Sequence, residues 1–392
     1  MSHPVRGAAA VVGVADEVSP DGTIPGDLRS VESRVIRAAL DDAGLGLADI
    51  DGIFTCTGGT MMHSVELAEY LGVSPRWTCS TQTGGSSYEL HVEQAAAAIA
   101  LGLCETALVV YASTPRSDRR RGGAGMGVLA TPERIEWEMP HGLFLPIGAY
   151  ALAASRHMAV YGTTSEQLAQ IAVDTRRWAE RNPRAFARDP LTVDDVLGSG
   201  TVASPLHKLD CCLVTDGAGA LVLTAAHRVP DTRHADDPVW VLGAGSHHTH
   251  SMISQMPDLT VTPGVESGER AFAMAELGPA DVDVVELYDS FTITVLLALE
   301  DLGFCAKGEG GAFVADGALG PGGALPGQTS GGGLSFTHPG AFGMFLLVEA
   351  VRQLRGEAGE RQVEGARTAV AHGCGGVLSA TSTVLLGTEE VR

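Results

Sequence analysis

The chain has 392 residues, of which 45% are hydrophobic, and a formal net charge of −21 at pH 7. This length and composition suffice for a large core and two or three structural units. The negative charge argues against nucleic acid and anionic membranes as partners, because both require a basic protein face. The sequence shows no run of 18 apolar residues and no basic-then-apolar leader. We therefore expect a cytoplasmic protein without a membrane span.

Apolar runs typical of buried strands alternate with helical stretches along the chain, which is the pattern of an α/β sheet covered by helices. Strands are predicted at residues 9–15, 50–55, 106–111, 218–223, 239–243, 283–287, 368–372 and 383–386. Helices are predicted at residues 31–43, 93–100, 293–302 and 345–354. The first of these helices should end at Gly44, since glycine favours the left-handed backbone that terminates helices.

Residues 113–204 differ from their surroundings. Arg116, Arg119, Arg120 and Arg121 precede a glycine-rich stretch, and later helices are charged and carry tryptophan. We interpret this segment as an inserted lid. The first half of the protein would then comprise residues 1–112 and 205–235, and the second half residues 236–392. The arginine run would either meet the phosphates of a ligand or form a solvated lid surface.

The cysteines and histidines do not form a metal-binding pattern. Irregular spacing of the cysteines excludes both a disulfide framework and a zinc ligand set. His247, His248 and His250 lie close together, but no cysteine or carboxylate follows at ligand spacing. We predict reduced thiols and no metal site. The cysteines are Cys56, Cys79, Cys104, Cys211, Cys212, Cys305 and Cys374.

Several segments carry a resemblance to a known family. They are residues 83–102, 209–220, 286–291, 330–334, 338–340 and 353–359. Together they make the chain similar, over nearly its whole length, to the sterol carrier protein x type thiolases and to the thiolase-like steroid side-chain aldolases of actinobacteria. The resemblance implies the thiolase fold, with two βαβαβαββ-type halves and an inserted lid. It also implies a homodimer, a coenzyme A thioester as substrate with no bound cofactor, and a small partner protein that combines a zinc ribbon with an OB-fold.

The resemblance also assigns individual positions. Gly85 stands where thiolases carry the nucleophilic cysteine, and Ser290 where they carry a second cysteine. An acyl-cysteine intermediate is therefore not expected, because glycine has no group to acylate. His338 matches the histidine of the oxyanion hole, and Tyr288 matches a tyrosine thought to act in the aldolases. Phe342 stands near the place where those aldolases carry a second tyrosine.

These positions predict retro-aldol cleavage of a 3-hydroxyacyl-CoA. That reaction needs a base for the hydroxyl proton and an oxyanion hole for the enolate, but no covalent intermediate. Tyr288 is the candidate base, with His338 as the neighbour that would lower its pKa from about 10. The alternative for Tyr288 is a structural phenol. Asp289 is a further catalytic candidate, although a turn aspartate more simply accepts backbone N–H bonds.

Two glycine loops, at residues 329–334 and 373–376, lack the spacing of a dinucleotide-binding motif. In thiolase-like folds such loops bring the backbone close to the thioester, where a Cβ would clash. The resemblance thus implies that the coenzyme A thioester is bound by Ser330, Gly331, Gly332, Gly375 and Gly376. Plain turn formation is the alternative.

Other functions stay open at this point. Ser86 is explained either as a helix N-cap or as the relocated nucleophile of an acyltransferase or condensing enzyme. Cys374 is explained either as a buried thiol or as that same nucleophile. A non-catalytic carrier of acyl-CoA or sterol is also compatible with glycine at position 85.

Overall fold

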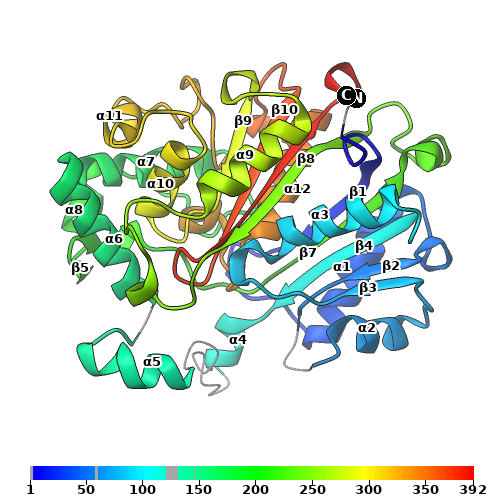
Figure 1. Ribbon diagram of the computed structural model, residues 1–392, viewed down its shortest axis with the longest axis horizontal. Helices are drawn as coiled ribbons and strands as arrows, with labels where there is room; N and C mark the ends of the chain where they lie inside the picture. The colour runs from blue at the N-terminus through cyan, green and yellow to red at the C-terminus, as the bar shows by residue number, and fades with distance from the viewer. Residues whose placement is uncertain (1–2, 58–60, 121–130, 145) are drawn as a thin grey trace.

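A computed structural model describes residues 3–57, 61–120, 131–144 and 146–392. Its centre is a nine-stranded mixed sheet with the order β3-β2-β4-β7-β1-β8-β11-β10-β9, and β5 pairs with β6 in a separate small sheet (Figure 1). The strands are β1 (Ala9–Glu17), β2 (Gly52–Phe54), β3 (Trp77–Cys79), β4 (Thr106–Ser113), β5 (Thr201–Ala203), β6 (Leu206–His207), β7 (Gly217–Ala225), β8 (Val239–His248), β9 (Val284–Leu287), β10 (Thr368–Gly375) and β11 (Ala380–Gly387).

Helices cover this sheet, and they begin and end where the sequence supplies suitable residues. In α1, the Asp27 carboxylate accepts the Ser30 N–H at the start, and Gly44 ends the helix at φ 71°. The α-helices are α1 (Leu28–Ala43), α2 (His63–Leu71), α3 (Ser87–Ala100), α4 (Pro115–Arg120), α5 (Pro132–Trp137), α6 (Pro146–Tyr161), α7 (Ser165–Glu180), α8 (Val193–Gly198), α9 (Gly264–Ala275), α10 (Thr292–Asp301), α11 (Gly310–Val314) and α12 (Gly343–Arg355).

The large sheet consists of two similar halves. In the first half, β2 and β4 are parallel, and β4, β7 and β1 follow in antiparallel order. In the second half, β9 and β10 are parallel, and β10, β11 and β8 follow in antiparallel order. The halves join where β1 pairs with β8, through Ala10 opposite Trp240 and Val11 opposite Val239.

In both halves, a glycine in a strand allows a helix to pack closely on the sheet. A Cβ at Gly13 of β1 would lie 2.8 Å from the Cβ of Ala43 in α1. A Cβ at Gly243 of β8 would lie 2.9 Å from the Cβ of Ala275 in α9. Glycine in the strand and alanine in the helix thus allow a close approach in each half. The two halves thus share this packing of a helix on a strand, which does not require a repeated sequence.

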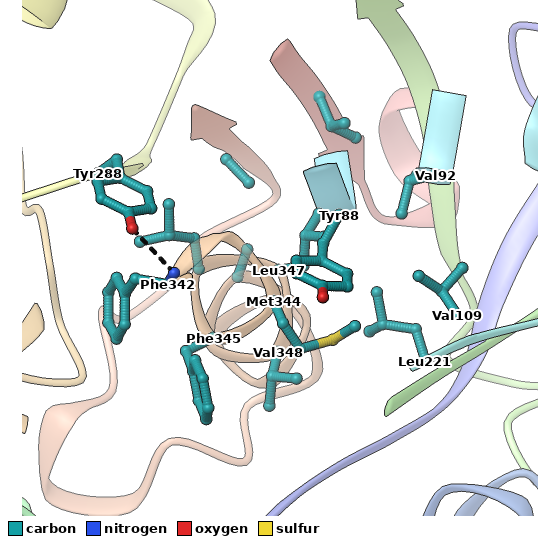
Figure 2. Close-up of a cluster of buried hydrophobic side chains, with 14 of the residues drawn as sticks. Tyr88, Val92, Val109, Leu221, Tyr288, Phe342, Met344, Phe345, Leu347 and Val348 are labelled. Atoms are coloured by element: carbon teal, nitrogen blue, oxygen red, sulfur yellow. Dashed lines mark hydrogen bonds between the residues drawn. The ribbon is translucent and has the colours of Figure 1, made fainter. Parts of the chain in front are cut away.

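The helices α3 and α12 form the centre of the molecule, because each contacts strands of both halves and the two contact one another. Side chains from α3, α12, β4 and β7 meet in one buried cluster (Figure 2). Most residues of both helices are buried, as expected for helices enclosed within a core. The N-terminal ends of these helices define the candidate site described below.

The second half departs from the predicted βαβαβαββ pattern. The position equivalent to β3 carries a single parallel bridge, from Val285 of β9 to Gly327. Pro326 contributes only its carbonyl, which accepts the Val285 N–H. Proline has no N–H for a ladder and glycine weakens a strand, so the segment does not extend the sheet.

The segment interpreted as a lid forms α4 to α8 and β5. Helices α6 and α7 pack on α10, and α7 packs on α8, so these helices gather at one side of the view (Figure 1). The division of the chain into three units stays a prediction. Among the described residues, no single helix is long and apolar enough to cross a membrane, although the bent pair of residues 132–141 and 146–161 meets the length and composition together.

Candidate active site

Tyr288 and His338, predicted to act together, are in contact. Tyr288 directly follows β9, and its N–H donates to the His372 carbonyl at 2.9 Å, which fixes it to β10. Its hydroxyl oxygen lies 3.1 Å from Nε2 of His338. The N–H of Phe342, the residue before α12, donates to the same hydroxyl oxygen at 3.1 Å (Figure 2). The phenol is therefore held between an imidazole and the positive end of a helix.

The ring of Tyr288 occupies the space in which a side chain at position 85 would project. Gly85 lies in the short helical turn that leads into α3. A Cβ built on it would lie 2.5 Å from Cζ of Tyr288 and would also collide with the Cys374 carbonyl oxygen. Such contacts are too short for real atoms, so Tyr288 in this position requires glycine at 85.

Both members of the pair are neutral at neutral pH. Burial raises the pKa of Tyr288 well above its usual value, despite the hydrogen bond from Phe342. Burial also lowers the pKa of His338 to about 4. The expectation that His338 lowers the pKa of Tyr288 was wrong, because loss of water outweighs the single hydrogen bond and the imidazole carries no charge.

The loop that carries His338 is fixed by neighbouring strands and turns. The His338 N–H donates to Oγ1 of Thr215 at 2.8 Å. The Tyr111 hydroxyl, from β4, donates to the Pro339 carbonyl at 2.6 Å and accepts the Ala341 N–H at 3.0 Å. Sequence reasoning missed Tyr111, which was assigned only to a buried strand. These bonds make it a positioning residue for the imidazole.

The carboxyl group of Asp289 holds the glycine loop in place. Its two carboxyl oxygens accept the N–H groups of Gly333 at 2.6 Å and Leu334 at 3.0 Å. Burial raises its pKa to about 7, and the two N–H bonds oppose that rise. The simpler interpretation, an aspartate that holds the glycine loop, therefore accounts for its geometry, and its direct catalytic role stays a prediction.

The two alternative nucleophiles lie nearby but are not activated. Ser86 precedes α3 without capping it, since its hydroxyl donates back to the Thr83 carbonyl at 3.2 Å. Ser86 therefore occupies the predicted N-cap position, but its side chain does not make the predicted capping hydrogen bond. Burial raises the pKa of the Cys374 thiol to about 12, so the reactive thiolate is scarce.

Two further buried groups near the site were missed in the sequence. Tyr150 of α6 is 3% exposed, and its ring packs on Phe291 at a centroid distance of 4.5 Å. Glu89 lies one helical turn after Gly85, and neither of its oxygens has a hydrogen-bond partner among the described residues. Burial raises its pKa to about 8. Glu89 had no distinct signal in the sequence, because the same helix also carries the polar residues His91, Glu93 and Gln94.

Comparison with known proteins identifies the family. A model of the thiolase C-terminal domain-like family matches residues 245–388. A steroid side-chain-cleaving aldolase of Thermomonospora curvata is 34% identical over 394 aligned positions, which cover 98% of each chain. The chain belongs to the thiolase superfamily. Within it, the chain falls in the group that contains the sterol carrier protein thiolases and the steroid side-chain aldolases.

Two other members of the thiolase superfamily bear on its function. An acetyl-CoA acetyltransferase of Methanothermobacter thermautotrophicus is 36% identical over 346 positions, covering 86% of this chain and 88% of that one. A solved structure described as an Ltp2-ChsH2(DUF35) aldolase aligns with a TM-score of 0.88 and 32% identity, over 99% of this chain and 100% of that one. Relatives thus include both lyases and acyltransferases that act on acyl-CoA or steroid side chains.

The glycine loops expected to bind the thioester in this thiolase-superfamily chain are packed against protein. A Cβ at Gly331 would lie 2.7 Å from the Cβ of Ala179, and one at Gly332 would lie 2.8 Å from Cγ of Asp289. A Cβ at Gly375 would lie 2.8 Å from the carbonyl carbon of Thr83. Internal packing therefore explains these glycines. Contact of Ser330, Gly331, Gly332, Gly375 and Gly376 with coenzyme A stays a prediction.

The arginine run of the lid is described only in part. Arg116 places its guanidinium 4.7 Å from the centroid of the Phe186 ring and donates to the Val214 carbonyl at 3.2 Å. It is thereby fixed against the protein rather than free for a phosphate. The side chains of Arg119, Arg120 and Arg121 lie outside the described part of the structure.

Proposed function

We propose that the protein is a carbon–carbon lyase that cleaves a 3-hydroxyacyl-CoA by a retro-aldol reaction. One observation carries this proposal: the Tyr288 ring fills the space above Gly85, and its hydroxyl bonds Nε2 of His338. A site built in this way has no room for a nucleophilic side chain at position 85. It retains groups for proton transfer and for stabilising negative charge, which are what this cleavage requires.

The first proton transfer uses the two residues as a unit. Because the pKa of Tyr288 is raised, the phenol is protonated before the reaction. It accepts the proton of the substrate hydroxyl as its own proton moves to Nε2 of His338. The bond between the α and β carbons then breaks, a ketone forms at the β carbon, and the electron pair becomes the enolate of the departing thioester.

The surroundings favour the negative charge of that enolate. The imidazolium formed at His338 would offset that charge. The N-terminal ends of α3 and α12 both approach Tyr288, through Gly85 and Phe342. A helix N-terminus carries about half a positive charge and stabilises anions within its first turn. Fixed dipoles of this kind contribute to catalysis without reorganising during the reaction.

An acyltransferase is the second candidate, because an acetyl-CoA acetyltransferase is among the relatives. It would need Ser86 or Cys374 as nucleophile. The Ser86 hydroxyl bonds the carbonyl and the hydroxyl of Thr83, and the pKa of Cys374 is raised to about 12. These environments favour the lyase. A non-catalytic carrier is disfavoured by the fixed pairing of Tyr288 with His338.

The proposal extends to the substrate and the assembly. The acyl group would be a steroid side chain, as the name of the Thermomonospora curvata relative says for that protein. A small partner with a zinc ribbon and an OB-fold would assist, by analogy with the two-component aldolase structure. We also propose a homodimer located in the cytoplasm.

The lyase is tested by product analysis and intact mass. The protein and its partner are incubated with a 3-hydroxyacyl-CoA that carries a tertiary hydroxyl, and a ketone and a shortened acyl-CoA are expected. In parallel, incubation with acetyl-CoA and acetoacetyl-CoA should leave the protein mass unchanged. A stoichiometric acyl adduct on Ser86 or Cys374 would instead establish the acyltransferase.

A further inference from the structure

We propose that a basic cavity at the C-terminal end of α12 binds a small molecule that carries a diphosphate group, at a site separate from the candidate active site. The cavity has a volume of about 520 Å³, which is within the usual size range of small-molecule sites. The segments that follow α7 and α12 form its walls. Five arginines line it, and they are Arg181, Arg184, Arg188, Arg352 and Arg361.

The cavity and the candidate active site lie at opposite ends of α12. The N–H of Phe342, just before the helix, donates to the Tyr288 hydroxyl, whereas Arg352 belongs to the last turn. Because an α-helix rises about 1.5 Å per residue, Arg352 lies about 15 Å along the axis from Phe342. Most residues of α12 are buried, so protein fills the space between the two places.

Three of the arginines are fixed by buried carboxylates. Arg184 and Arg352 both donate to the same oxygen of Asp16, Oδ1. One carboxylate thus serves two guanidinium groups and leaves an excess of positive charge. Arg361 donates through Nε and Nη2 to the two oxygens of Glu349, each at 3.0 Å. These bonds hold the three guanidinium groups in place at the cavity.

The other two arginines have no acidic partner. Among the described residues, no carboxylate oxygen lies within 4.0 Å of the guanidinium nitrogens of Arg181 or Arg188. The Arg181 guanidinium lies 5.5 Å from the centroid of the Trp178 ring, and Nη2 of Arg188 donates to the Glu180 carbonyl at 3.1 Å. A ring and a carbonyl orient these groups without neutralising them. Each guanidinium has five N–H donors, so donors remain for a ligand.

The wall that follows α7 is formed in advance of binding. The Phe186 N–H donates to the Phe336 carbonyl at 3.1 Å, and the Ala187 N–H donates to the Ser335 carbonyl at 2.9 Å. The side-chain amide of Asn182 donates to the Ser330 carbonyl at 2.7 Å. A ligand would therefore bind without ordering this segment, which removes one of the costs of binding.

The chemistry of the cavity selects phosphate groups. The planar guanidinium presents paired N–H donors that match the oxygens of a phosphate. Arginines come from both walls, and the cavity is larger than one phosphate requires, so two linked phosphates suit it better than one. Glu357 and Glu360 also line the cavity. Both are exposed and are outnumbered by the arginines, in a chain whose net charge is −21.

The test is isothermal titration calorimetry of the full chain with sodium pyrophosphate and with ADP, at roughly physiological salt. Each probe should bind saturably, with one molecule per chain. Inorganic phosphate and citrate should bind about 10-fold more weakly or less, because each loses contacts that a diphosphate makes. The double variant Arg181→Gln/Arg188→Gln should lower the affinity for pyrophosphate by about 10-fold or more, the scale of one lost hydrogen bond between charged groups.

The matched control is Arg37→Gln/Arg233→Gln, which also removes two positive charges at exposed positions and should bind pyrophosphate like the native protein. Thermal unfolding should show that both double variants are folded, since neither breaks an ion pair with a carboxylate of the described residues.

Three results would overturn the inference. They are the absence of saturable binding of pyrophosphate and ADP, an equal affinity for citrate, and a loss of acetyl-CoA affinity in Arg181→Gln/Arg188→Gln. The last result would assign the cavity to the phosphates of the acyl-CoA itself. None of these measurements depends on carbon–carbon cleavage, so failure of the proposed lyase function would leave this inference standing.

Discussion

At the scale of single residues, Tyr288 is the group on which the proposed chemistry depends. Tyr288→Phe removes only the hydroxyl and leaves the ring over Gly85, so the fold and acyl-CoA affinity should persist. Cleavage should fall by about 10²-fold or more, as for other general bases. Steady-state rates on a tertiary 3-hydroxyacyl-CoA measure this effect, with exposed Tyr70→Phe as control. Full turnover of the variant would place the base elsewhere.

Glu89 makes a second prediction, for the pH dependence of stability. Its pKa rises from 4.5 to about 8 on folding, because burial disfavours the carboxylate. The folded protein thus holds a proton that the unfolded chain releases between these values. The stability linked to this group is complete below pH 4.5 and is lost as the pH rises through 8.

Glu89→Gln is neutral at every pH and should abolish this loss. Between pH 5 and 9 its free energy of unfolding should decline less than that of the native protein, by at most about 5 kcal/mol, since one pKa unit corresponds to about 1.4 kcal/mol. Urea unfolding at several pH values measures the difference. Glu269→Gln, at an exposed position of α9, is the control. Parallel pH profiles for native protein and Glu89→Gln would contradict the buried carboxyl.

At the scale of elements, the turn that leads into α3 packs directly against Tyr288, the residue that follows β9. Gly85→Ala introduces a Cβ into the Tyr288 ring. Overpacking of this kind destabilises by about 1–3 kcal/mol, and displacement of the phenol should abolish cleavage. Gly198→Ala in α8 is the control, because a Cβ there meets nothing within 4 Å. Thermal unfolding and turnover should change in Gly85→Ala alone, and an active, stable Gly85→Ala would refute the packing.

At the scale of the whole molecule, the edge of the sheet at β3 suits self-association. β3 is an edge strand, and beside it Trp77, Leu101 and Leu103 line a shallow hollow of about 280 Å³. Leu101 is 75% exposed. An edge strand with exposed apolar neighbours is a ready site for pairing with a second chain. The proposed homodimer would bury this region.

Leu101→Arg should therefore convert the dimer into a monomer, because it would bury a charge in the interface. Sedimentation velocity at micromolar concentration distinguishes the two states. Val202→Arg alters a residue of similar exposure in the separate two-stranded sheet and should remain dimeric. A native protein that sediments as a monomer would remove the basis for this interface.

Sequence patterns predicted the central helices and eight of the nine strands of the large sheet, because these depend on local periodicity, and they missed the three-residue edge strand β3. The contact of Tyr288 with His338 was predicted through the family resemblance. Three features could not be read from the sequence, since each depends on packing between distant segments. They are the raised pKa of Tyr288, the hydrogen bond from the Ser86 hydroxyl to the preceding Thr83 carbonyl, and the packing of Tyr150 of α6 on Phe291. The absence of a strand at Pro326 could have been predicted, because proline has no N–H to donate to a neighbouring strand.

The collision between a Cβ at position 85 and the Tyr288 ring also constrains how this site arose. Any ancestor with a side chain at position 85 could not accept a tyrosine at 288 without displacing it. Such an ancestor would have had to lose that side chain before the gain of the tyrosine or together with it. In the reverse direction, introducing a cysteine at 85 would first require removing Tyr288. The two positions form an ordered mutational path, and ancestral variants with both side chains should not fold into an active site.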